Sequence, residues 1–360
     1  MKERISLYQT ALLLAVTVVP TAIVFLPSVA IERAARDAWI SGLLMILGGL
    51  ILSALYTALI KKMGSMDFIE FNKKVLGKWL TYLLGINLII YFVLSAGVII
   101  RETTEVVIAN YLPLTPLWFL NMTMILVGVI FVFYGLECMA RTVEILFYLF
   151  LGIFLLVMLM VIDELDPQFL QPVMARGIKP VISGTFPGLI FFSELFIILF
   201  WSPNLKKRKK VHKALLAGTF ISGLIFMLVI CYSIMLFGAS LADELALPLI
   251  TQVSYVSKLD VFERLDPLVL FFWVGGGIGK VTIFMYGALY TGQKLLKLPT
   301  YYKLIFPILP PVFYFSYYYF PNITEINKFL SNTYPYYLAI QFLYPLLLYI
   351  VSFIRKKNIS

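Results

Sequence analysis

Histidine and cysteine are scarce in this sequence. His212 is the single histidine among 360 residues, and Cys138 and Cys231 are the only cysteines. A zinc site needs several His or Cys ligands and a Ser-His-Asp triad needs a positioned histidine, so the chain has almost no material for either. Both cysteines lie in or beside apolar segments, where a packing role is more common than a disulfide. The composition therefore argues against an enzyme, and no cofactor is expected.

Charge is scarce as well. Only 13% of the residues are charged, whereas a soluble globular chain carries roughly 25%. The mean hydropathy is +0.93, and no polar stretch is long enough to form a separate soluble domain. A P-loop is also missing, because the run GGGIGKVT at 275–282 has the wrong spacing and lies within an apolar segment. We expect an integral membrane protein that is not an ATP-driven pump.

Ten apolar runs are long enough, at about 20 residues, to cross a hydrocarbon core of about 30 Å. The first run continues to residue 31 without a small-residue cleavage site, which indicates a retained helix rather than a signal peptide. We therefore expect one all-α transmembrane domain over residues 1–360. The predicted spans cover about 7–30, 38–60, 79–108, 115–136, 142–162, 180–202, 212–238, 266–292, 302–320 and 333–354.

Lysine and arginine predict the orientation of these spans. With the N-terminus inside, the inner segments hold 20 of the 29 basic residues and the outer segments hold seven. This asymmetry follows the positive-inside rule, so both termini are predicted to be cytoplasmic. The basic run KKRKKVHK at 206–213 joins two spans, which makes it a topology anchor near anionic headgroups. We expect no nucleic-acid partner despite the net charge of +10.

Prolines mark two spans as irregular. Pro20 lies near the centre of the first span and the pair Pro187–Gly188 lies at a similar depth in the sixth. Proline removes a backbone donor and clashes with the preceding turn, so breaks are expected near residues 18–21 and at residues 187–188. These are the first helices of two five-span halves, about 7–162 and 180–354, which must insert with inverted topology. Matched interruptions of this kind point to a binding site at the membrane midplane, although a plain proline kink is the alternative for each.

Two charges lie at mid-depth in the predicted spans. Glu194 is the only charge in the stretch 183–201, and Lys280 lies near the middle of the eighth span in a glycine-rich stretch. A charge at the bilayer centre costs about 2.5–3.5 kcal/mol on insertion scales, so a function or a partner is expected to offset it. Glu194 either binds a ligand's amino group or forms a structural ion pair with Lys280; the residues leave both open.

The third span supplies further candidates. Asn87, Tyr91 and Ser95 recur at a spacing of four and share one helical face. That face either lines a cavity or makes hydrogen bonds to other helices. Arg101 lies nearer the outer end, together with Glu102 and Glu105, where gate or interface roles are expected for all three.

Five stretches distributed over nearly the whole chain form an ordered set: AIVFLPSVA, EVVIANYLPLTPLWFL, FYGLECMARTVEILFYLFL, FFSELFIILFWSPNLKKRKK and FERLDPLVLFFWVGGGIGKVTIFMYG. In this order they resemble the B-subunit family of spore germinant receptors, the spore germination permeases of the amino acid–polyamine–organocation superfamily. One departure is at the first span, where related transporters have glycines and this chain has Pro20 and Ala22.

The resemblance implies a LeuT-like fold of two inverted five-helix halves, with broken first and sixth helices. It also implies nutrient sensing, often of amino acids, in complex with an A-type membrane subunit and a C-type lipoprotein in the inner spore membrane. In such folds spans 1 and 8 hold a structural sodium, which the ammonium of Lys280 would replace. The candidate ligand-binding residues are Val19, Pro20, Thr21, Tyr91, Ser95, Gly184, Gly188, Phe192 and Glu194.

The sequence leaves two functions open. In the first, the chain is a ligand-sensing subunit whose occupancy biases a partner complex. In the second, it is a secondary amino-acid transporter that moves its ligand across the membrane. Adjacent reading frames for an A and a C subunit would favour the first, and uptake into liposomes by this chain alone would favour the second.

The predicted topology can be tested by cysteine labelling from outside the cell. Cysteines introduced in the loops at 163–179 and 239–262 should react with a membrane-impermeant maleimide, whereas cysteines in 203–211 should react only after permeabilisation. The positive-inside distribution of Lys and Arg is the physical reason. The reverse labelling pattern would show that the orientation is wrong.

Overall fold

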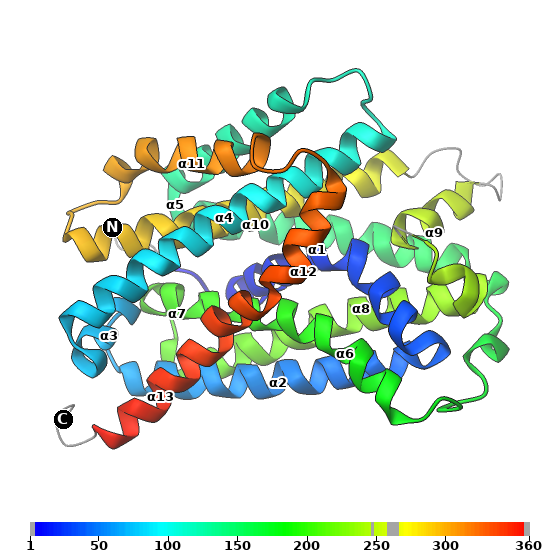
Figure 1. Ribbon diagram of the computed structural model, residues 1–360, viewed down its shortest axis with the longest axis horizontal. Helices are drawn as coiled ribbons and strands as arrows, with labels where there is room; N and C mark the ends of the chain where they lie inside the picture. Colours follow the sequence, from blue (N-terminus) through cyan, green and yellow to red (C-terminus); the bar gives the residue numbers. More distant parts are fainter. Residues whose placement is uncertain (1–3, 246–247, 258–265, 356–360) are drawn as a thin grey trace.

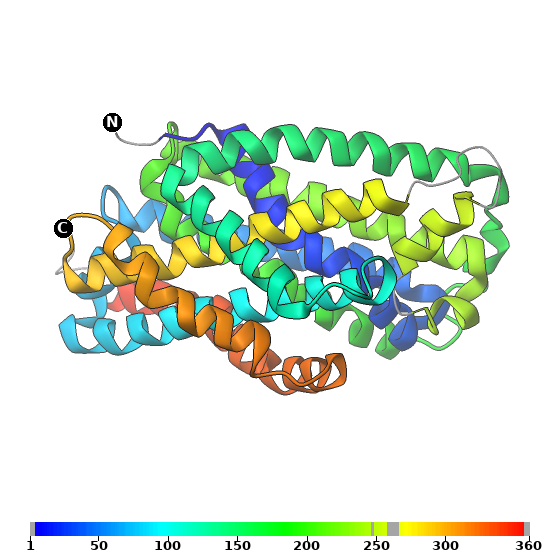
Figure 2. The ribbon, with the colours of Figure 1, turned by 90° about the horizontal axis from the view of Figure 1, so that it is seen from above.

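The structure is a computed structural model that describes residues 4–245, 248–257 and 266–355, and these form a helical bundle. In these ranges the only β-type pairing is an isolated bridge between Ile5 and Leu205. Most helices run roughly along the long dimension of the molecule (Figures 1 and 2). The α-helices are α1 (Leu7–Ala34), α2 (Ala38–Met63), α3 (Phe68–Leu76), α4 (Lys78–Asn110), α5 (Leu117–Met160), α6 (Ile178–Ser193), α7 (Ile198–Trp201), α8 (Val211–Ala242), α9 (Pro248–Ser257), α10 (Asp266–Leu296), α11 (Ile305–Tyr317), α12 (Ile323–Leu338) and α13 (Tyr344–Ile354).

Helix α1 lies inside the bundle. It contacts α2, α5, α6, α8, α9 and α10, and 20 of its 28 residues are buried. The sequence explains this position, because a helix that is apolar on every side is stable only when other helices or lipid surround it. Residues on opposite faces of α1 therefore contact different parts of the core.

The expected break in the first span is wrong. Helix α1 continues from Leu7 to Ala34 through both Pro20 and Pro27. The indole Nε1 of Trp273 on α10 donates a hydrogen bond of 2.5 Å to the carbonyl oxygen of Pro20. Proline has a φ compatible with helix, and neighbouring helices commonly supply polar partners around such sites in membrane proteins.

The sixth span is irregular, but not where the sequence predicted. Helix α6 continues through Pro187 and Gly188, and the change comes at a 3₁₀ turn, Glu194–Ile197, before α7. Gly188 serves close packing instead, since a Cβ atom there would lie 2.4 Å from Sδ of Met45 on α2. The irregular backbone thus begins at Glu194, about two turns after Pro187.

Seven helical segments in the described part of the chain are long and apolar enough to cross a membrane. One of them, Leu7–Met63, contains the first two predicted spans, and another, Leu117–Met160, contains the fourth and fifth. Helix α11 has only 13 residues, with Pro310 and Pro311 inside it, which is shorter than the length predicted for the ninth span. The chain is therefore a multi-pass membrane protein. Helix α1 begins and α13 ends at the same end of the bundle (Figures 1 and 2).

A single glycine bends α5. Gly135 has φ 88° and ψ 176° in the middle of this 44-residue helix, a region of backbone space open essentially to glycine alone. Figure 2 shows the two limbs of α5 leaving this bend in different directions. The bend lies at the end of the predicted span 115–136, a few residues before the predicted span 142–162.

Replacing Gly135 by alanine should destabilise the folded protein. A Cβ atom at this φ and ψ costs about 1–3 kcal/mol, which should lower the midpoint of thermal unfolding of the purified protein in detergent. Gly152 on the same helix is the matched control, because nothing lies within 4 Å of a Cβ added there. Gly152→Ala should leave the midpoint unchanged or raise it; equal losses in both variants would contradict the bend.

Candidate functional site

The centre of the bundle holds a buried ion pair. Nζ of Lys280 on α10 lies 2.7 Å from Oε2 of Glu194, at the start of the 3₁₀ turn. The same ammonium donates a hydrogen bond of 2.6 Å to Oγ1 of Thr21 on α1. The side chains of Lys280 and Glu194 are 2% and 12% exposed. Three elements far apart in the sequence therefore meet at one ammonium group.

Glycines on α10 allow this meeting. A Cβ atom added at Gly276 would lie 2.7 Å from Cγ of Pro20, and one at Gly279 would lie 3.0 Å from Cγ1 of Val16. Larger residues at either position would push α10 away from α1 and lengthen the contact between Lys280 and Thr21. The glycine-rich stretch 275–279 thus sets the distance between the two helices.

The ion pair is costly to assemble and more costly to break. Removing two charges from water costs several kcal/mol per ion, and mutual attraction offsets this only in good geometry. The two charges lie 2.7 Å apart, and the hydroxyl of Thr21 accepts a hydrogen bond from the ammonium. A single charge left without its partner at this depth would carry the whole desolvation cost.

A third buried charge lies nearby, and the sequence did not single it out as a site residue. Glu102 on α4 is 8% exposed and lies within electrostatic range of both Lys280 and Glu194. It was expected to act at a gate or interface together with its two neighbours. The structure separates them: Arg101 pairs with Glu105 at 2.7 Å and donates to the carbonyl oxygen of Tyr317.

A polar network beside the ion pair includes the last span. Between α12 and α13 the chain forms a π-helical turn, Ala339–Leu343, which places Gln341 in the core with 2% exposure. Its amide nitrogen donates to the hydroxyl of Tyr91, and its Oε1 accepts from the hydroxyl of Ser193. π-Helical turns are frequent at functional sites. The signal in the sequence was a lone amide in an apolar span, the same kind of signal that pointed to Glu194.

Aromatic rings surround Tyr91. The rings of Phe92, Phe196, Phe284 and Tyr337 have centroids 5.3–5.9 Å from it, all tilted or edge-on. Ser95, one turn along α4, is also buried. Two candidates of the third span, Tyr91 and Ser95, therefore face the interior beside the ion pair. Asn87 lies farther along α4, where its Oδ1 accepts from the hydroxyl of Tyr336 at 3.5 Å.

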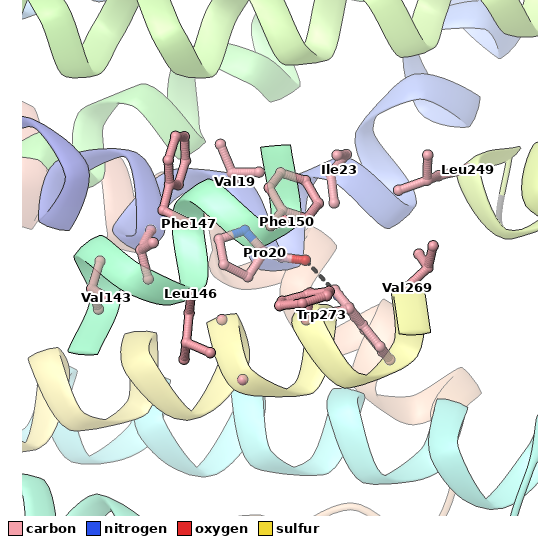
Figure 3. A pocket seen from close by; sticks show the side chains of 14 residues that line it. Val19, Pro20, Ile23, Val143, Leu146, Phe147, Phe150, Leu249, Val269 and Trp273 are labelled. Carbon is pink, nitrogen blue, oxygen red and sulfur yellow. Dashed lines mark hydrogen bonds between the residues drawn. The ribbon is translucent and has the colours of Figure 1, made fainter. Parts of the chain in front are cut away.

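An apolar cavity of about 50 Å³ lies on another face of α1 (Figure 3). Val19 and Pro20, two of the candidate ligand-binding residues, line it, and Trp273 lies across from Pro20. None of the described residues that line it carries a charged side chain. Its other lining residues are Val16, Ile23, Val143, Leu146, Phe147, Phe150, Leu249, Val269, Phe272, Gly275 and Gly276.

Three candidates of the sixth span are not brought to the ion pair. A Cβ atom at Gly184 would lie 2.7 Å from Oγ of Ser41, and Gly188 packs on Met45. The ring of Phe192 makes an edge-on contact with the ring of Phe226 on α8. These residues hold α6 against α2 and α8. The sequence also predicts that the loop before the eighth span, residues 240–266, covers the cavity from outside, with Glu263, Arg264 and Asp266 pairing with one another or with the third span. Glu263 and Arg264 lie outside the described residues, as does the side chain of Asp266.

The family model for spore germination proteins matches residues 4–324. The chain belongs to this family. Spore germination protein KB of Bacillus subtilis (strain 168) is 30% identical over 365 residues, 99% of this chain and 96% of that protein. Spore germination protein YndE of the same strain is 28% identical over 289 residues, covering 78% and 77% of the two chains. Spore germination protein A2, also from that strain, is 24% identical over 363 residues, or 98% and 97%.

The fold of this germination protein resembles that of a transporter. The closed structure of MHP1, a nucleobase-cation-symport-1 family transporter with bromovinylhydantoin bound, superposes with a TM-score of 0.64. The match covers 98% of this chain and 84% of that one at 12% sequence identity. It shows a LeuT-type transporter fold, as the resemblance in the sequence predicted.

Breaking the ion pair should reduce the amount of folded protein. Glu194→Gln or Lys280→Met leaves one charge unpaired, which costs about 3–5 kcal/mol. Membrane abundance and thermal midpoint should fall in both single variants and recover in the double variant, which carries no charge at either position.

An exposed pair provides the control for this experiment. Lys328 and Glu325 lie 2.8 Å apart with side chains 64% and 45% exposed, so Lys328→Met should change stability by less than about 1 kcal/mol. A double variant that is as depleted as the two single variants would show that Glu194 and Lys280 do not depend on each other.

Proposed function

We propose that this chain is the ligand-binding membrane subunit of a spore germinant receptor. Its ligand is a small nutrient, an amino acid, held at mid-depth between α1, α4, the α6–α7 span and α10. The cluster of Lys280, Glu194 and Thr21 carries the proposal, because ionisable groups buried in a membrane domain mark functional sites by default. Membership of the germination family supports a role in spore germination. The LeuT-type fold supports a ligand-binding site at the membrane midplane.

The proposed architecture has ten spans in two inverted halves, about 7–162 and 180–354. Two of the seven long apolar segments in the described residues each contain two predicted spans, and the bias of basic residues favours cytoplasmic termini. The membrane is the inner membrane of the spore. These features would place the buried cluster between the halves, where LeuT-type folds bind their ligands.

In this proposal the chain is not an enzyme and acts through partners, an A-type membrane subunit and a C-type lipoprotein. Ligand binding shifts the chain between two conformations, and the shift is limited by the difference in affinity for the two. The 3₁₀ turn at Glu194–Ile197 and the π-helical turn at Ala339–Leu343 are the segments suited to such a change, since irregular helix often marks hinges.

A secondary amino-acid transporter is the second candidate. The observation that favours it is the similarity in fold to a transporter. A transporter moves its ligand without partner subunits, whereas a receptor subunit needs them. The two candidates therefore differ in a measurable property of the isolated chain.

Deleting the gene in its parent bacterium should produce spores that no longer germinate on one class of nutrient, and the intact chain should restore the response. The purified chain in liposomes should take up no radiolabelled amino acid beyond the level of empty liposomes. Complementation with Lys328→Met, which alters only an exposed pair, is the control. Normal germination of the deletion spores, combined with uptake in liposomes, would favour the transporter instead.

A further inference from the structure

The charges around Lys280 do not balance. One ammonium group faces two carboxylates, Glu194 on the 3₁₀ turn and Glu102 on α4. Both carboxylates are buried in membrane-spanning segments. Arg101, the nearest arginine in the sequence, is engaged with Glu105 and with backbone carbonyls of the α11–α12 connection. With both carboxyl groups ionised, the cluster carries one more negative charge than positive.

Glu102 is placed at the cluster by the packing of α4 on α10. A Cβ atom added at Gly277 would lie 3.1 Å from Oγ1 of the neighbouring Thr103, and Lys280 follows one turn later on α10. Tyr337 on α12 is also within electrostatic range of Glu102 and Glu194. Helices α4, α10 and α12 thus converge around the two carboxylates.

The two carboxylates differ in one respect. Glu194 contacts Lys280 directly at 2.7 Å. Glu102 has no hydrogen bond or ion pair with any residue in the described part of the chain, and the residue is 8% exposed. Its oxygens are not among the fully enclosed ones that lack a partner, so the carboxylate keeps some accessible surface. Buried ionised groups without a partner are strongly disfavoured, so an unpaired carboxylate in this position is suited to a cation that comes from outside the chain.

We propose that Glu102 binds the cationic amino group of the nutrient, while Glu194 is already neutralised by Lys280. This inference rests on the proposed function and names the group that recognises the ligand. The ammonium group of the ligand supplies a positive charge to Glu102, and the ligand's own carboxylate is held by other groups of the site. Glu102 is then the residue that distinguishes amines from otherwise similar molecules without an amino group.

The proposal makes Glu102 and Glu194 behave in opposite ways. Glu102→Gln removes an unpaired buried charge, so the ligand-free protein should become more stable, as is common when a functional residue is replaced. Glu194→Gln removes the direct contact of 2.7 Å with the ammonium of Lys280 and should make the protein less stable. Glu105→Gln is the matched control on α4, because its side chain is 26% exposed and pairs with Arg101.

The test measures thermal unfolding of the purified full chain in lipid nanodiscs, alone and with each common amino acid in turn. At least one amino acid should raise the midpoint of the wild type and of Glu105→Gln. Glu102→Gln should have a higher midpoint without ligand and should bind the same amino acid about 10- to 100-fold more weakly, since a hydrogen bond to a charged group is lost. The 2-hydroxy acid with the same side chain should not raise the midpoint of the wild type.

Four results would overturn the inference. Undiminished binding to Glu102→Gln would show that its carboxylate holds a proton or another cation. A ligand-free Glu102→Gln less stable than the wild type would show a structural role. Equal binding of the 2-hydroxy acid would show that no amino group is recognised. If no amino acid stabilises the wild type, the proposed function itself fails, and the inference fails with it.

Discussion

One ammonium group buried at the centre of a membrane protein constrains much of this structure. Lys280 is on a helix where water cannot solvate it, so the chain must bring acceptors to it. Glu194 and Thr21 do so from two other elements, at 2.7 and 2.6 Å. The cost of leaving such a charge unpaired exceeds the contribution of most single contacts to stability. The arrangement of α1, α10 and the 3₁₀ turn follows from that requirement.

The backbone around the cluster departs from the α-helix in two places, and one tyrosine joins them. The hydroxyl of Tyr56 on α2 lies 2.9 Å from the carbonyl oxygen of Ser193 and 2.9 Å from that of Gln341. Ser193 precedes the 3₁₀ turn and Gln341 lies in the π-helical turn. Irregular turns leave backbone carbonyls without their usual helical donors, and at membrane depth another group must replace those donors. Tyr56 therefore links the two segments most suited to move.

Helix α1 separates two chemically different regions. The polar cluster lies on the side of Thr21, and the apolar cavity lies on the side of Val19 and Pro20 (Figure 3). Nε1 of Trp273 donates a hydrogen bond of 2.5 Å to the carbonyl oxygen of Pro20. Helix α10 therefore contacts α1 at Pro20 as well as at Thr21. A change in the position of α1 would alter both regions together. This coupling is compatible with the proposed function, in which ligand binding changes the conformation of the chain.

The sequence by itself determined the class of protein. Scarce charge and long apolar runs leave only a helical membrane domain, because backbone groups in lipid must be paired within helices or closed barrels. The quoted stretches, in their order along the chain, identified the family, and lone polar residues in apolar spans pointed to Glu194 and Lys280. Those inferences depend on composition and local pattern, which require no knowledge of tertiary contacts.

Only the tertiary structure decided which residues meet. Pro20 predicted a break, yet α1 remains helical there. The φ angle of proline fits a helix, and Trp273 on α10 donates a hydrogen bond to the carbonyl oxygen of Pro20. Gly188 suggested unwinding but serves packing on Met45. Glu102 looked like an outer-end residue by its neighbours, whereas the packing of α4 on α10 brings it near Lys280. Contacts between residues more than 80 positions apart depend on how helices pack, and a single sequence does not contain that information in local form.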